Sequence, residues 1–296
     1  MIAPNFMVLG ASKSATTTLY DVLKKHDDIY TPSFKEPHFF NIDENYNKGL
    51  EWYQKTYYKN VGKKKLIFDF TPTYLYSSSC AKRIFDSLGS EVKFIIILRN
   101  PVDRAYSQYL HSRRDGHESS DFMSSINNES ARIDAARKNN DILSEFRYSY
   151  ISQGLYYNML RSYLEYFQLE NFLIINFEEE IVGDIEKTVK NLSNFLDTDL
   201  STLNFDIHSN KSGKSRFSFI QKILKEGGFW RKAIKFFTPQ LLRQIIRNRI
   251  KNFNKIDFSY NILEKDLRKK IYKEYFLQDV LMLEELINKK MNWDIK

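Results

Sequence analysis

The segment that begins at Val8, VLGASKSATTTLYDVL, has the residue types of an anion-binding loop. A short apolar stretch runs into a tight turn from Gly10 to Lys13, and hydroxyl side chains then lead into an amphipathic pattern. Backbone N–H groups at a helix N-terminus carry partial positive charge, and Lys13 adds a full one. The loop is therefore predicted to hold a nucleotide-like anion. The residues expected to contact it are Lys13, Ser14, Ala15, Thr16, Thr17 and Thr18.

This loop differs from the ATP/GTP-binding pattern G-x-x-x-x-G-K-[ST]. Lys13 follows Gly10 by only three positions, and no second glycine precedes the lysine. An ordinary capped helix is the alternative interpretation of the segment taken alone.

A second candidate anion site lies in LRNPVDRAYSQYLHSRR, which begins at Leu98. Arg99 follows an apolar stretch, Pro101 favours a helix start, and Ser107 comes about two turns later. Because a guanidinium group binds phosphate oxygens in a bidentate fork, Arg99 and Ser107 could hold one phosphate together. The alternative is an arginine that closes a strand in front of an exposed helix.

The elements that would position these residues alternate between strand-like and helix-like patterns. Such alternation predicts an α/β fold with a parallel sheet covered on both faces, whose ligands bind beyond the carboxyl ends of the strands. Strands are expected near Phe6–Leu9, Leu66–Phe70, Val92–Leu98 and Phe172–Phe177. Helices are expected after Thr17 and at Ser78–Leu88, Val102–Arg113, Ser152–Phe167 and Ile185–Leu196.

The composition narrows the class of protein. With 296 residues and a 42% apolar share, the chain can bury a full core. It has no run of eighteen apolar residues, and no charged leader precedes the first strand, so we expect a cytoplasmic protein. Cys80 is the single cysteine, which excludes a disulfide framework within the chain. The five histidines lack ligand spacing, so no metal site is expected.

The two anion-site segments, with the motifs around them, resemble sulfotransferases that use 3′-phosphoadenosine 5′-phosphosulfate (PAPS), in particular the bacterial and heparan-sulfate types. GASKSATTTL resembles the family's 5′-phosphosulfate loop, and LRNPVDRAYSQY resembles its 3′-phosphate motif. KEPHFF, FDFTPTYLY and NKSGKSRFS are similar to further family motifs and occur in the family's order. The resemblance implies a P-loop-like three-layer fold with a central parallel sheet flanked by helices, and a helical C-terminal extension.

The same resemblance assigns roles to particular residues. It implies that Lys13 is catalytic, that Glu36 is the base that takes the acceptor's proton, and that His38 orients Glu36 or acts in its place. It also implies an aromatic ring near the adenine and a late loop over the nucleotide; the residues concerned are Tyr156, Lys211, Lys214, Ser215 and Arg216. Phe70 departs from the pattern, because heparan-sulfate enzymes typically have a lysine there. At this position the resemblance to the heparan-sulfate enzymes' acceptor-binding arrangement does not extend to this chain.

Sulfuryl transfer also agrees with these residue types on chemical grounds. A donor with a 3′-phosphate and a 5′-phosphosulfate needs two anion sites, which the Lys13 loop and Arg99 with Ser107 could provide. Lysine and aligned N–H donors can stabilise the charge that grows on the leaving phosphate. We expect PAPS as donor, PAP as product, no metal, and a hydroxyl-bearing acceptor such as a saccharide or glycolipid.

A strongly basic segment lies late in the chain. Between Lys214 and Lys255 there are twelve basic residues and one acidic residue, Glu226, interleaved with aromatic residues. This pattern predicts a single domain, 1–296, with a PAPS-binding core at 1–216 and a basic amphipathic helical extension at 217–296. Residues 217–256 could contact the inner face of a membrane or a polyanion, or could form a solvated helical face. No nucleic-acid-binding motif accompanies the charge.

The segment between Ser112 and Tyr150 is polar and could be an acceptor-side insertion or a solvated helical excursion. Two alternative functions also remain open. A P-loop kinase-like phosphotransferase would use Mg-ATP, against which the missing Gly-Lys-Ser/Thr ending counts. A noncatalytic protein would bind a membrane or a polyanion through the basic segment alone.

Overall fold

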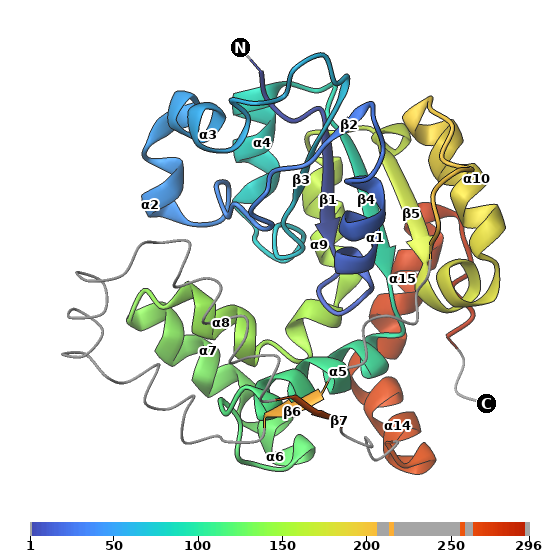
Figure 1. The fold of residues 1–296 in the computed structure, drawn as a ribbon. Helices are drawn as coiled ribbons and strands as arrows, with labels where there is room; N and C mark the ends of the chain where they lie inside the picture. Colours follow the sequence, from blue (N-terminus) through green and yellow to red (C-terminus); the bar gives the residue numbers. More distant parts are fainter. Residues whose placement is uncertain (1, 206–212, 216–254, 258–262, 294–296) are drawn as a thin grey trace.

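The computed structural model describes residues 2–205, 213–215, 255–257 and 263–293. A five-stranded sheet in the order β2-β3-β1-β4-β5 forms its centre, and all neighbouring strands are parallel (Figure 1). The strands are β1 (Phe6–Gly10), β2 (Ile29–Tyr30), β3 (Leu66–Phe70), β4 (Lys93–Leu98) and β5 (Phe172–Asn176). The four strands predicted from the sequence are confirmed. The sequence pattern missed β2, whose two residues are too short to show alternation.

Helices cover both faces of this sheet because its strands are apolar on both sides. Phe6 and Val8 belong to a core shared with one pair of helices, whereas Met7 and Leu9 belong to a core shared with three others. The pair is α1 (Thr16–Leu23) and α10 (Ile185–Leu196). The other three are α4 (Cys80–Leu88), α9 (Tyr156–Leu164) and α15 (Leu277–Ile287). The predicted three-layer α/β fold is confirmed.

The remaining helices precede β3 or follow β4 in the chain. α5 (Pro101–Arg114) leaves the carboxyl end of β4, and three further helices pack beside it in Figure 1. These three are α6 (Phe122–Asn127), α7 (Glu129–Lys138) and α8 (Ile142–Tyr148). Two short helices, α2 (Asp43–Tyr46) and α3 (Gly49–Tyr57), lie between β2 and β3 in the chain. The polar segment 112–150 is thus largely helical.

One expected helix is shorter than the sequence pattern indicated. Instead of a single helix over 152–167, the structure has a 3₁₀ turn at Ser152–Gly154, followed by α9. Gly154 packs so closely that a Cβ there would lie 2.8 Å from the Phe276 ring and 3.1 Å from Pro101. Tertiary packing against these two residues therefore decides the local backbone, which periodicity alone does not show.

The described part of the C-terminal region packs on the α/β core. It contains α14 (Lys265–Ile271), a π-helical segment (Tyr272–Phe276) and α15, which packs against α9. β6 (Gly213–Ser215) and β7 (Lys255–Asp257) form an antiparallel pair, and β6 contacts α5. Most of the predicted membrane-contacting segment 217–256 lies outside the described residues, so that prediction and the division near residue 216 stay predictions. Among the described helices, none is long and apolar enough to cross a membrane.

Candidate active site

The loop between β1 and α1 turns sharply at the carboxyl end of the central strand. Lys13 and Ala15 have positive φ angles of 75° and 60°, and α1 begins directly afterwards at Thr16. Gly10 allows β1 to approach the segment that follows β3. A Cβ at this position would lie 2.9 Å from the Leu75 side chain and 3.2 Å from the Pro72 carbonyl oxygen. The Oγ atom of Ser14 is buried and has no hydrogen-bond partner in the described part of the chain. The loop thus presents an unsatisfied polar group at a helix N-terminus.

Positive charge is concentrated around Lys13. Burial, together with the nearby guanidinium groups of Arg114, Arg99 and Arg104, lowers the pKa of Lys13 to about 8, although Asp115 opposes the shift. A lysine in this setting gains stabilisation when an anion binds beside it. The electrostatics therefore favour an anionic ligand at this loop.

Arg99 lies next to the Lys13 loop because β4 is the neighbour of β1. Its Nη1 atom donates to the Lys13 carbonyl oxygen at 3.1 Å, and its guanidinium group lies 4.9 Å from the Phe177 ring centroid. Its Nε atom is buried without a hydrogen-bond partner among the described residues. The Tyr156 hydroxyl donates to the Arg99 carbonyl oxygen at 2.9 Å. Two of the predicted anion-binding residues, Lys13 and Arg99, are therefore in direct contact.

The start of α5 fixes the direction of the chain after Arg99. Asn100 caps the helix, since its Oδ1 atom accepts hydrogen bonds from the backbone N–H groups of Val102 and Asp103, and Pro101 occupies the first turn. Arg104 is fully buried one turn later, where its Nη2 atom donates to the carbonyl oxygen of Tyr150. Its Nε and Nη1 atoms lack partners in the described chain. The sequence analysis did not single out Arg104, although it follows Arg99 within the same motif.

A second loop, between β2 and α2, lies against the carboxyl end of β3 and faces this region. Glu36 and His38 both have positive φ angles, 64° and 53°, and the Glu36 N–H donates to the Phe70 carbonyl oxygen at 3.1 Å. The His38 Nε2 atom lies 3.7 Å from Glu36 Oε2, and its Nδ1 atom lies 3.2 Å from Asn41 Oδ1. Asn41 thus holds Nδ1, and Nε2 is the ring nitrogen that faces Glu36.

Partners on both sides keep the Glu36 carboxylate charged. Burial by itself raises its pKa, but the hydrogen bond from His38 and the charge and hydrogen bond of Lys35 outweigh burial and lower the pKa to about 2. Glu36 is therefore ionised throughout the neutral pH range.

A buried network holds the backbone of this loop. The Tyr74 hydroxyl accepts from the N–H groups of Phe39 at 2.9 Å and Phe40 at 3.3 Å, and it donates to Asp69 Oδ2 at 3.2 Å. Asp69 also accepts from Tyr53 at 2.5 Å and from Thr71 at 2.6 Å. The shape of the loop therefore depends on a carboxylate inside the core.

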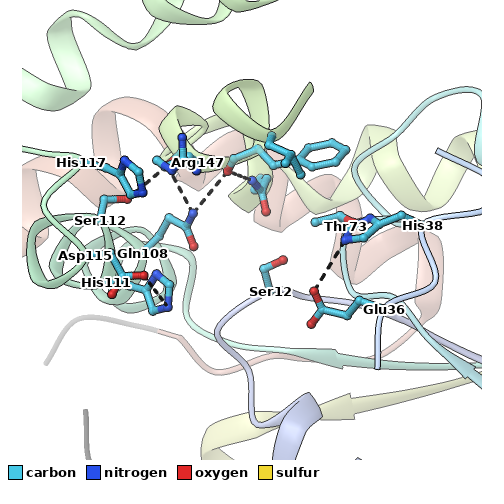
Figure 2. A pocket seen from close by; sticks show the side chains of 13 residues that line it. Ser12, Glu36, His38, Thr73, Gln108, His111, Ser112, Asp115, His117 and Arg147 are labelled. Carbon is cyan, nitrogen blue, oxygen red and sulfur yellow. Dashed lines mark hydrogen bonds and ion pairs between the residues drawn. The ribbon is translucent and has the colours of Figure 1, made fainter. Parts of the chain in front are cut away.

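A cavity of about 310 Å³ separates the two loops and α5. Figure 2 shows Glu36, His38 and Thr73 on one side, α5 side chains on the other, and Ser12 of the Lys13 loop between them. The full lining is Ser12, Glu36, His38, Thr73, Gln108, His111, Ser112, Asp115, His117, Leu143, Phe146, Arg147 and Gln153. α8 belongs to the polar segment 112–150 and contributes Leu143, Phe146 and Arg147 to this lining.

Several of these lining residues were missed by the sequence analysis. His111 is one of them; burial and the charges of Lys13 and Arg114 lower its pKa to about 3, so its imidazole is neutral at neutral pH. A signal was present in the spacing, because Gln108, His111 and Asp115 continue the α5 stripe that starts at Arg104. Within the described chain, no group of three or more acidic, histidine or cysteine side chains could hold a metal ion.

The other residues expected at the site have different positions. Thr16 and Thr18 are buried at the start of α1, whereas Thr17 is exposed. Ser107 is half-buried on α5. Tyr156 is buried and its ring lies 5.8 Å from the Trp293 ring, so its expected contact with an adenine stays a prediction. Lys214 and Ser215 belong to β6, which contacts α5, while Lys211 and Arg216 lie outside the described residues.

The chain is similar to several known proteins. It is 43% identical to the membrane-associated sulfotransferase kil1 of Dictyostelium discoideum over 108 residues, which are 36% of this chain and 22% of that protein. It is 29% identical to mouse heparan sulfate glucosamine 3-O-sulfotransferase 3B1 over 195 residues, 65% of this chain and 46% of that protein. The chain thus spans less than half the length of these two relatives.

A solved structure and a family model extend the comparison to most of the chain. The sulfotransferase from Alicyclobacillus acidocaldarius has the same fold with a TM-score of 0.69 and 26% identity, covering 99% of both chains. A family model described as the sulfotransferase domain matches residues 3–237. On this match, which includes both loops and α5, the chain belongs to the sulfotransferase domain family.

Proposed function

We propose that this protein transfers the sulfuryl group of PAPS to a hydroxyl group of a saccharide or glycolipid, with PAP and a sulfate ester as products. One observation carries the proposal: Lys13 and Arg99 meet at the ends of adjacent strands, and Glu36 faces Ser12 of the same loop across a cavity. Cations on one side and a carboxylate base on the other are what this transfer requires.

The proposal of PAPS as the sulfuryl donor is supported by polar atoms that lack hydrogen-bond partners in the described chain. These are Ser14 Oγ, Arg99 Nε, and Arg104 Nε and Nη1, all of them buried hydrogen-bond donors. Buried donors without partners are costly, and the phosphate oxygens of an anionic nucleotide would satisfy them. We assign Lys13 and Ser14 to the 5′-phosphosulfate and Arg99 with Ser107 to the 3′-phosphate. The late-loop residues Lys211, Lys214, Ser215 and Arg216 are proposed to close over the nucleotide.

PAPS supplies a sulfuryl group attached to a phosphate that can leave. Lys13, whose pKa of about 8 leaves it mostly protonated at neutral pH, would stabilise the negative charge that develops on the bridging oxygen. Phosphate groups nearby would raise the Lys13 pKa and strengthen this effect. The chemistry needs no metal ion, because the transferred group carries little charge.

Glu36 is proposed to take the proton from the acceptor hydroxyl while the new sulfur–oxygen bond forms and the bond to the phosphate oxygen breaks. Its carboxylate is ionised at neutral pH and lines the cavity. His38, with Nε2 directed toward Glu36, would orient the carboxylate or receive the proton in its place.

A saccharide acceptor is supported by the names of heparan sulfate relatives and by the cavity lining. Gln108, Ser112 and Arg147 line the cavity with the amide, hydroxyl and guanidinium groups that sugar hydroxyls and acidic sugars bind. Phe70 packs against Tyr20 with ring centroids 5.3 Å apart, at the position where heparan-sulfate enzymes typically have a lysine. We therefore expect the acceptor contacts at this point to differ from those of the heparan enzymes.

The test is transfer of label from ³⁵S-PAPS to acceptors of two kinds, desulfated heparan sulfate and glycolipid vesicles. Label in either acceptor, with PAP formed in equal amount, would support the proposal. Glu36→Gln should lose transfer while it still binds PAP, because the substitution removes the base and leaves the donor loop. Transfer by Glu36→Gln at the wild-type rate would contradict the assignment of the base.

A further inference from the structure

The Lys35 side chain connects α1, the helix that follows the Lys13 loop, to the loop that carries Glu36. Its Nζ atom donates to Thr17 Oγ1 at 2.9 Å and to Glu36 Oε1 at 3.1 Å, and only 17% of its side chain is exposed. Thr17 is the second residue of α1, directly after the phosphate loop. One ammonium group thus bridges the element that would hold the donor and the residue that would act as base.

The two oxygens of Glu36 have different neighbours. Lys35 contacts Oε1, whereas His38 lies 3.7 Å from Oε2. Across the cavity, α5 and the turn after it contribute His111, Asp115 and His117, and α8 contributes Arg147. Lys35 is therefore the neighbour at hydrogen-bond distance from the carboxylate, whereas His38 lies farther from it.

The backbone gives the carboxylate little support of its own. Glu36 and His38 both lie in the left-handed region, and the Glu36 side chain is 39% exposed. The backbone bond from Glu36 to Phe70 fixes where the loop starts, but it does not fix where the carboxylate points. The direction of the side chain depends on Lys35 and His38.

We propose that Lys35 is a positioning residue that couples donor binding to the base, since its ammonium group holds the Glu36 carboxylate in place while it is anchored to α1 through Thr17. The inference rests on the proposed function, because it concerns the same transfer site. A rearrangement of the phosphate loop when the nucleotide binds would reach Glu36 along the path Thr17, Lys35, Glu36.

The first test measures the titration of Glu36 without any acceptor. In protein carrying ¹³C-labelled glutamate, the Glu36 carboxyl resonance is the one lost in Glu36→Gln. Removing the nearby positive charge in Lys35→Gln should raise the Glu36 pKa by about 1 to 3 units. Lys35→Arg keeps the charge and should keep the wild-type titration. Lys55→Gln is the matched control, because Lys55 pairs with Glu51 at 2.5 Å on α3, away from the site.

The second test measures coupling to the donor site with PAP as the probe. PAP should shift the Glu36 resonance in the wild type and in Lys55→Gln, and the shift should be lost in Lys35→Gln although PAP still binds. An unchanged Glu36 titration in Lys35→Gln, or an equal response to PAP, would overturn the inference. Failure of the wild type to bind PAP would instead overturn the proposed function, so the two failures are distinguishable.

Discussion

The two sides of the cavity differ in how their polar groups are satisfied. We call the side formed by the Lys13 loop and Arg99 the donor side, and the side formed by Glu36 and His38 the acceptor side, after the roles proposed for them. On the donor side, Ser14 Oγ and Arg99 Nε are buried without partners in the described chain, and burial together with nearby positive charge lowers the Lys13 pKa. On the acceptor side, Glu36 and His38 contact each other, and Lys35 and Asn41 contact them from outside. The donor side needs an anion to complete it, whereas the acceptor side keeps its shape through its own contacts.

The largest expected effect comes from removing the cation at the centre of the donor side. Lys13→Ala should lower kcat by about 10²- to 10³-fold, because an electrostatic donor to the developing charge is lost. The fold should survive, because Lys13 lies in the loop between β1 and α1 and belongs to neither element. The measurement is PAP release together with the melting temperature. Lys24→Ala is the control, because Lys24 follows α1 and pairs with Asp21 at the surface; equal activity of the two variants would contradict the account.

The next effect separates the two phosphate positions. Arg99→Ala should weaken PAP binding by about 1.5 to 3 kcal/mol, the range for hydrogen bonds to charged groups. AMP lacks the 3′-phosphate, so its affinity should change far less. Calorimetric titration with both nucleotides checks this, and Arg161→Ala on the exposed face of α9 serves as the control. An equal loss for PAP and AMP would move Arg99 away from the 3′-phosphate.

A smaller effect should come from the buried hydrogen-bond network that holds the backbone of the loop with Glu36 and His38. Tyr74→Phe removes the acceptor of two backbone N–H groups and a donor to Asp69. We expect kcat to fall about tenfold through displacement of the base loop, with stability lower by about 1 to 3 kcal/mol and PAP affinity unchanged. Tyr30→Phe also loses one tyrosine hydrogen bond, at 2.7 Å to the Tyr57 carbonyl oxygen, and should leave kcat unchanged. A fall in PAP affinity in Tyr74→Phe would show that the two sides are not separable in this way.

The smallest effect concerns the protonation of the Lys13 side chain. The folded-state pKa of Lys13 is about 8, below the ordinary lysine value of 10.5, so the unfolded chain binds more protons between these values. The free energy of unfolding should therefore rise with pH from about 8 to 10.5 through this group, and Lys13→Met should lack that part. PAP should also raise the Lys13 pKa and cause proton uptake at pH 8.5. Calorimetry in buffers of different ionisation enthalpy measures that uptake, and its persistence in Lys13→Met would contradict the assignment.

The donor side was also the part that the sequence predicted better. The residues of the Lys13 loop are contiguous, and Arg99 follows an apolar strand, so the parallel sheet brings the two together by topology alone. The acceptor side draws on the loop between β2 and α2, the turn after β3, α5 and α8, which are far apart in the chain. Tyr74, Asp69 and Arg147 carry no local signal of their roles, because their partners are set by tertiary packing. The turn at Gly154 was missed for the same reason, whereas β2 was missed because its two residues are too short to show alternation.

Thermal unfolding with PAP, with AMP and with ATP plus Mg²⁺ tests the central claim most directly. A ligand at 100 times its Kd stabilises a protein by about 2.7 kcal/mol, enough to raise the melting temperature by several degrees. The account predicts a clear shift with PAP, a smaller one with AMP and none that depends on Mg²⁺. A shift with Mg-ATP alone would indicate a phosphotransferase, and no shift with any nucleotide would contradict the donor site and direct attention to the basic segment 217–256.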